Sequence, residues 1–216
     1  MLNITLIRNI MKYIELREKL KDVAVFSIKD IEKSADKRFH RRRLNEWQDK
    51  DYIKKIIKGY YIFSDLKLDD DVLYEIANKI YDPSYISLET ALSYYGLIPE
   101  SVYALTSVST RKTITFNTTI AVFNYRKVKN DLFFGYVIEK HDSKVYKIAS
   151  PEKAILDFLY LKSDIRSYSD FEGLRINPGN FIEIIDRGKL FNYLKPYNNK
   201  RLTAVISDFW EYINHA

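Results

Sequence analysis

The spacing of apolar residues changes twice along the chain, and this change most constrains the fold. Across residues 103–149 apolar and polar side chains alternate with a period of two, which predicts short strands at 104–108, 112–117, 120–125, 132–139 and 144–148. On both sides of this region the apolar residues recur at helical spacing. We therefore predict an α+β chain, with a helical N-terminal part, a mixed α/β part built on an antiparallel sheet, and C-terminal helices.

The net charge is confined to the first third of the chain. The whole chain has 35 basic and 29 acidic residues, a difference of +6, and residues 1–66 alone have 16 and 10, again +6. Residues 67–216 therefore have 19 of each and are neutral. A length of 216 residues is sufficient for two domains. We predict a polyanion-binding domain over 1–66 and a second domain with a separate task over 67–216.

The motifs of the first domain follow the order of a winged helix-turn-helix. An amphipathic helix is predicted over 3–19, and Ser27 and Asp30 form a capping box that begins a short helix at 28–34. A basic helix, with Phe39, Leu44 and Trp47 on its apolar face, follows and ends near Lys50. The β-rich run 53–63 contains Gly59, the residue type that a tight hairpin or wing requires.

The basic helix and the wing contain the candidate DNA contacts. Recognition helices present their N-terminal residues to base edges in the major groove, where Arg pairs bidentately with guanine. The predicted base contacts are Arg41, Arg42 and Asn45. The predicted phosphate contacts are Lys37, Arg38 and Arg43 on the helix, with Lys54, Lys55 and Lys58 beside the wing. The alternative is a charged helix face that only meets water.

The second domain shows no catalytic motif. The chain lacks Cys, its three His residues have no ligand spacing, and no Gly-rich phosphate loop is present, so we expect no metal, no cofactor and no enzymatic activity. Ser87 and Ser150 are interpreted as N-caps, and the charges of Glu152 and Asp157 are attributed to helix electrostatics. The less favoured alternative is a catalytic carboxylate pair among Glu89, Glu100, Glu152 and Asp157. The basic turn 110–112 is a hairpin turn that could also touch a ligand, RNA or protein.

Three segments resemble the AbiEi family of antitoxins and related transcriptional regulators. They are YISLETALSYYGLIPE at 85–100, LFFGY at 132–136 and IASPEKAILD at 148–157. The resemblance covers about residues 20–165, and the predicted winged helix agrees with the organisation of that family. The helical tail after residue 165 is not matched to that family.

The resemblance implies the antitoxin of a type IV toxin-antitoxin system, a class that acts in abortive infection and phage defence. In such a protein the winged helix binds inverted repeats in its own promoter as an autorepressor, and the second domain counters a nucleotidyltransferase-like toxin, with or without direct contact. The alternatives are an orphan regulator whose second domain binds proteins and, less favoured, a nucleotidyl-transfer enzyme. With no leader pattern and no 18-residue apolar span, we expect a cytoplasmic location and no membrane contact.

Overall fold

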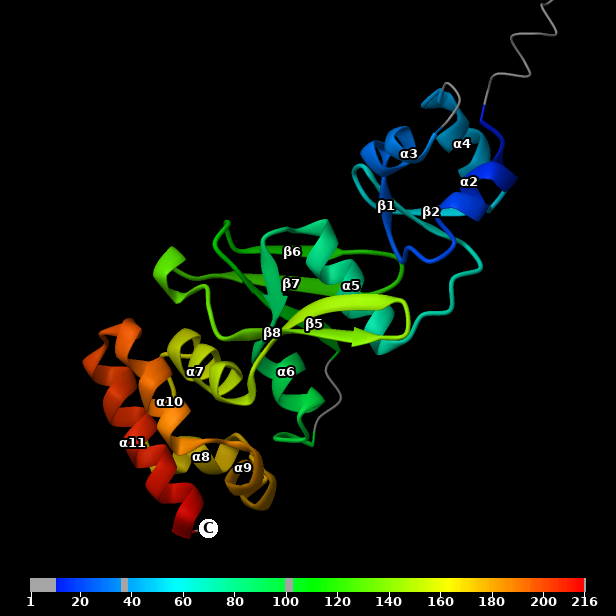
Figure 1. Cartoon of the computed structure of the whole chain (residues 1–216). Helices are drawn as coiled ribbons and strands as arrows, with labels where there is room; N and C mark the ends of the chain where they lie inside the picture. Colours follow the sequence, from blue (N-terminus) through cyan, green and yellow to red (C-terminus); the bar gives the residue numbers. More distant parts are fainter. Residues whose placement is uncertain (1–10, 36–38, 100–102, 216) are drawn as a thin grey trace, which may run out of the picture.

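The computed structural model of the chain describes residues 11–35, 39–99 and 103–215. A small N-terminal unit (residues 11–63) lies at one end, a central sheet with helices on both faces lies in the middle, and the C-terminal helices lie at the other end (Figure 1). The expected mixed α/β architecture with C-terminal helices is therefore confirmed.

In the N-terminal unit the described residues form three helices and a small antiparallel sheet, whose strand order is β1-β3-β2. Its elements are α2 (Tyr13–Lys19), β1 (Phe26–Ser27), α3 (Ile28–Ser34), α4 (Arg42–Asp49), β2 (Ile53–Ile57) and β3 (Tyr60–Phe63). The predicted opening helix is confirmed for residues 13–19, whereas its part at 3–10 lies outside the described residues.

The capping box of α3 is confirmed. The Ser27 N–H donates to the Asp30 carboxylate at 2.8 Å, and the Asp30 N–H donates to Ser27 Oγ at 3.3 Å. The predicted extent of the basic helix is wrong, because α4 begins only at Arg42. Phe39 precedes this helix and reaches the core from a loop, where its ring lies 6.0 Å from that of Trp47.

The small sheet has two buried faces. Phe26 and Phe63 on one face share a core with Leu44 and Trp47 of α4. On the other face Ile62 belongs to the larger core of the rest of the chain, together with Val25, Ile56 and residues of the central sheet. The helices α3 and α4 thus lie on the side of the small sheet that faces away from the central sheet (Figure 1).

The central sheet has the strand order β6-β7-β5-β4-β9-β8. The strands are β4 (Ser84–Ile86), β5 (Ala104–Ser109), β6 (Ile114–Asn117), β7 (Val122–Lys127), β8 (Tyr136–His141) and β9 (Lys144–Ala149). The expected antiparallel pairing is found for β6 with β7 and for β8 with β9, and β4 also pairs antiparallel with β5. However, β5 with β7 and β4 with β9 are parallel, so the sheet as a whole is mixed.

Two details of the strand prediction are wrong. The strand expected over 132–139 begins at Tyr136, because the 3-10 turn η1 (Asn130–Leu132) and Gly135, at φ +73°, redirect the chain first. The central strand β4 was not predicted at all. With three residues it is too short to show a period of two.

Helices cover both faces of the central sheet. On one face lies α5 (Asp70–Ile80), which is capped by the Asp69 side chain and whose Ala77 O accepts a hydrogen bond from the Tyr125 hydroxyl of β7 at 2.7 Å. On the other face lie α6 (Leu88–Tyr94) and α7 (Pro151–Leu161). Thr106 of β5 faces α6, since its N–H and the N–H of Thr90 each donate to the other residue's hydroxyl oxygen.

The predicted helical tail is confirmed. It contains α8 (Tyr168–Gly173), α9 (Pro178–Ile184), α10 (Arg187–Leu194), the 3-10 turn η2 (Lys195–Tyr197) and α11 (Lys200–His215). Phe209 of α11 packs edge-on against Phe171 and Phe181 and joins α8 and α9 to it. In the described parts of the chain, no helix is both long enough and apolar enough to cross a membrane.

A buried polar network joins the central sheet to the C-terminal helices. Lys153 and Asp157, one turn apart on α7, form an ion pair, and neither side chain is accessible to solvent. Asp157 also accepts hydrogen bonds from the hydroxyls of Tyr85 at 2.8 Å, Ser87 at 2.9 Å and Tyr197 at 2.9 Å. The Lys153 ammonium donates to Tyr197 Oη at 2.7 Å. Residues from β4, α7 and η2 thus meet at one charge pair.

This network corrects two expectations. Ser87 does not cap α6 with its side chain, because its hydroxyl donates to Asp157 instead. Asp157 is not explained by helix electrostatics, since it lies in the middle of α7 and is paired with Lys153. Ser150, by contrast, caps α7 as predicted and accepts from the Lys153 N–H at 3.4 Å.

Removing Asp157 should strongly destabilise the protein. The substitution Asp157→Ala leaves the Lys153 ammonium and three hydroxyl groups buried without their acceptor, which should lower the free energy of unfolding by about 3–5 kcal/mol. Urea unfolding measures this loss. The exposed Asp164 is the control, and Asp164→Ala should change the same quantity by less than about 0.5 kcal/mol. Equal effects of the two substitutions would contradict the importance of the ion pair.

The protein should lose stability in alkaline solution. Burial raises the pKa of eight tyrosines above the ordinary value of 10.0, namely Tyr13, Tyr61, Tyr74, Tyr85, Tyr95, Tyr125, Tyr146 and Tyr197. Above this pH the folded chain keeps protons that the unfolded chain releases, so the free energy of unfolding falls as the pH rises. Burial lowers the pKa of Lys153, which acts in the opposite direction but at one group only. The urea midpoint of unfolding should be lower at about pH 11 than at about pH 8, and equal midpoints would contradict this linkage.

Candidate nucleic-acid interface

The predicted base-contacting residues lie together at the beginning of α4. The side chains of Arg41 and Arg42 are 73% and 88% exposed, and Asn45 is also exposed. Asn45 follows these two residues by four and three positions, so the three side chains are neighbours on the helix surface. The structure thus brings together the three residues that were expected to contact bases.

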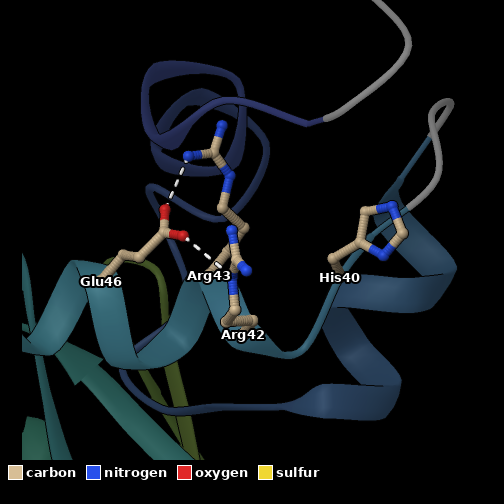
Figure 2. A pocket seen from close by; sticks show the side chains of 4 residues that line it. All are labelled: His40, Arg42, Arg43 and Glu46. Carbon is tan, nitrogen blue, oxygen red and sulfur yellow. Dashed lines mark hydrogen bonds and ion pairs between the residues drawn. The ribbon is translucent and has the colours of Figure 1, made fainter. Parts of the chain in front are cut away.

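Each arginine of this cluster has an acidic partner that the sequence interpretation did not include. Arg43 Nη1 lies 2.8 Å from Glu46 Oε2, and Arg42 Nε lies 3.4 Å from Glu46 Oε1 (Figure 2). Arg41 Nη2 lies 3.7 Å from Glu32 Oε1 on α3. The hydrogen bond from Arg43 is the main cause that lowers the pKa of Glu46. The helix start is therefore less positive than its run of arginines suggests.

The position of Glu46 in the sequence could have predicted its ion pairs with Arg42 and Arg43. It follows Arg42 by four positions and Arg43 by three, which are the separations at which helical side chains meet. Arg43 consequently differs from its neighbours, because its side chain is only 33% exposed and is held by Glu46. We expected Arg43 to contact phosphate, but this pairing engages its guanidinium within the protein.

A cavity of about 470 Å³ opens at the same helix end and is lined by His40, Arg42, Arg43 and Glu46. Figure 2 shows both guanidinium groups directed toward the Glu46 carboxylate, with the His40 ring across from them. The rim thus presents a ring nitrogen and two guanidinium groups around one carboxylate. Such a set can donate hydrogen bonds to phosphate or to guanine, and its carboxylate can accept one from cytosine.

The predicted hairpin is present between β2 and β3. Gly59 adopts φ +88° in its turn, a conformation that glycine favours. Lys54, Lys55 and Lys58 are all exposed on this hairpin, and Lys54 lies 3.9 Å from Asp51. The hairpin therefore presents three cations to solvent. The other two predicted phosphate contacts, Lys37 and Arg38, lie outside the described residues.

The helix before α4 is tied to the rest of the protein. Asp30, the residue that completes the capping box of α3, forms an ion pair of 3.3 Å with Lys79 on α5. The ammonium of Lys144 donates to Asp22 O at 3.0 Å. The orientation of α3 is thus set both by its own cap and by contacts with the central part of the chain.

The carboxylates considered for catalysis have structural partners. Glu89 pairs with Lys162 at 2.8 Å, and buried Glu152 pairs with Lys189 at 2.8 Å and accepts from Ser150 Oγ. Asp157 belongs to the polar network, and Glu100 lies outside the described residues. Within the described ranges, no group of three or more His, Cys, Asp or Glu side chains could hold a metal ion.

The basic turn at 110–112 is also held by the fold. The Arg111 guanidinium stacks over the Tyr81 ring, 4.2 Å from its centroid, and donates to Asp82 O at 3.1 Å. This side chain therefore supports the turn.

Neither the known protein families nor the curated proteins include a match to this chain.

Proposed function

We propose that the protein is a DNA-binding regulator whose N-terminal unit is a winged helix, with α4 entering the major groove and the β2–β3 hairpin acting as the wing. The observation that carries this proposal is the exposed group Arg41, Arg42 and Asn45 at the start of a helix, where recognition helices have their base contacts. The order of the elements, with α3 before α4 and a two-stranded hairpin after it, supports the same assignment.

The ion pairs of α4 refine the roles of its arginines. Glu46 holds the guanidinium of Arg43 close to the protein, so we assign Arg43 to positioning rather than to phosphate binding. Arg42 is 88% exposed and only 3.4 Å from the same carboxylate, which fixes the direction of a side chain that reaches outward. Restricting the rotamers of such a side chain lowers the entropy lost when it binds a base.

We further propose that the protein is a cytoplasmic, autorepressing antitoxin of a type IV toxin-antitoxin system. This part is supported by the resemblance of three segments to the AbiEi family. In the folded chain these segments meet, since Tyr85 comes from the first, Gly135 from the second, and Lys153 and Asp157 from the third. A Cβ at Gly135 would lie 3.2 Å from Lys153 Cβ, so the second segment requires a glycine beside the network.

DNA binding is tested with the DNA upstream of its gene and a scrambled duplex, by mobility shift over a range of salt concentrations. Arg41→Gln combined with Arg42→Gln should reduce the preference for the upstream DNA, because each lost bidentate base contact reduces discrimination by about 1–3 kcal/mol. Replacing Lys54, Lys55 and Lys58 with Gln should weaken binding to both duplexes equally. It should also reduce the slope of log affinity against log salt by about one per lost phosphate contact.

Two further variants control this experiment. Lys129→Gln combined with Lys140→Gln removes the same charge as the double arginine variant, from exposed positions outside the N-terminal unit, and should leave the preference unchanged. Glu46→Gln removes the negative charge beside Arg42 and Arg43, and should strengthen binding at low salt. If the double arginine variant behaves as its charge-matched control does, α4 is not the recognition helix.

Antitoxin activity is tested by co-expression with a nucleotidyltransferase-like protein encoded beside its gene. The full chain should restore growth to cells that this protein arrests. The double variant at Arg41 and Arg42 should restore growth equally well, because the two tasks are assigned to different parts of the chain. Failure of the unaltered chain to restore growth would contradict the antitoxin part of the proposal and would leave the DNA-binding part standing.

A further inference from the structure

A polar depression of about 390 Å³ lies on the face of the central sheet that α6 and α7 cover only in part. Thr106 of β5 lies beneath α6, whereas Thr113 and Thr115 on the other side of β7 are exposed. The depression is therefore a notch between the helices and the uncovered strands. Its lining residues are Leu88, Glu89, Thr106, Thr113, Thr115, Asn124, Tyr125, Arg126, Leu161 and Lys162.

Strand register places the polar side chains of this notch in rows. Thr106 of β5 pairs with Asn124 of β7, which in turn pairs with Thr115 of β6. Arg126 follows Asn124 by two positions on β7, so it extends from the same face of the sheet. The alternate residues Phe123 and Tyr125 are buried against the α5 side.

Three side chains that line the notch can donate hydrogen bonds to a ligand. Thr115 Oγ1 donates to Asn124 Oδ1 at 2.8 Å, an arrangement that orients the Asn124 amide group. Thr113 Oγ1 accepts from the Lys127 N–H at 3.1 Å and so retains its own proton for donation. Within the described ranges, Arg126 has no ion pair and the Asn124 amide nitrogen has no acceptor. The notch thus offers an amide, a hydroxyl and a guanidinium as donors.

On one side of the notch the backbone is strained at Leu88, and hydrogen bonds of the neighbouring residues fix it in place. Leu88 is buried and adopts φ +57°, a left-handed conformation that is rare for a bulky residue. Thr106 Oγ1 donates to Ser87 O at 2.7 Å, and Thr90 of α6 exchanges hydrogen bonds with Thr106. Strained residues of this kind persist where surrounding contacts fix them, and they concentrate at ligand sites. The same turn begins the helix that contains Glu89.

We propose that this polar depression binds a small phosphomonoester. The Arg126 guanidinium and the Asn124 amide would donate to the phosphate oxygens, a task for which the planar guanidinium is well suited. Glu89, paired with Lys162 at 2.8 Å, would accept a hydrogen bond from a hydroxyl or amino group on the rest of the ligand. This site is independent of the proposed DNA contacts.

Charge and size select this class of ligand. Arg126 and Lys162 outnumber Glu89 by one positive charge, which favours an anion. The guanidinium, amide and hydroxyl donors are numerous enough to serve more than one oxygen of a phosphate group. A volume of about 390 Å³ is within the range of small-molecule sites and exceeds the needs of inorganic phosphate. A nucleoside monophosphate and a hexose phosphate both satisfy these conditions.

The test is isothermal titration of the full chain with AMP, GMP, CMP and UMP in one arm, and with glucose 6-phosphate in the other. Binding in either arm is expected and identifies the source of the phosphate group. Arg126→Gln should weaken that binding at least about tenfold. Asn124→Asp keeps the shape of the side chain but replaces the donating amide with a negatively charged carboxylate, so it should abolish binding of the phosphate compound. Lys127→Gln is the matched control, because this neighbouring cation extends from the opposite face of β7.

Two results would overturn the proposal. One is the absence of binding by all five compounds at concentrations up to about 10 mM. The other is binding that Arg126→Gln and Lys127→Gln weaken to the same extent. Both residues are exposed, so equal thermal midpoints of these variants and the unaltered chain verify that they are folded.

Discussion

The buried ion pair of Lys153 and Asp157 is the contact on which the rest of the structure depends. Taking two charges out of water is costly, and the cost is offset only when the remaining hydrogen-bonding groups are satisfied. Here the carboxylate receives three hydroxyl donors in addition to the ammonium. These donors come from β4, from the turn before α6, and from η2, so the hydrogen bonds of the pair are complete only when the sheet and the C-terminal helices are both in place. The network therefore makes the assembly of these parts cooperative.

The same pair brings together three distant segments of the chain, which contain Tyr85, Gly135 and Lys153. Each segment provides residues to the network or to its immediate surroundings, and Gly135 allows the chain to pass against the stem of Lys153. These residues determine packing, since none of the network's charged atoms reaches solvent. Any chemistry or recognition must therefore occur elsewhere. Two accessible places with side chains suited to recognition are the start of α4 and the polar depression beside α6.

Local chemistry made part of this structure predictable. The capping box of α3, the Ser150-Pro151 start of α7 and the Gly59 turn depend on residues within a few positions of each other, and all three are confirmed. The roles of Ser87 and Asp157 depend instead on each other across 70 positions, which no local pattern reveals. The candidate site shows the same division. The exposed arginines could be predicted from the sequence, and so could their pairing with Glu46, which follows them at helical spacing. The polar depression could not, because it depends on the register of three strands.

The geometry of the small sheet determines how the two candidate sites relate to each other. One of its faces packs against α3 and α4, and the other is buried against the central part of the chain, where Asp30 and Lys79 connect α3 to α5. A DNA duplex that accepts α4 must approach from the helical side, which faces away from the central sheet (Figure 1). The polar depression lies on the face of that sheet opposite α5, next to α6 and α7. A ligand there would not compete with DNA for space, and any coupling between the two sites would pass through the contacts of the N-terminal unit with the central part of the chain, which include the shared core and the Asp30–Lys79 pair.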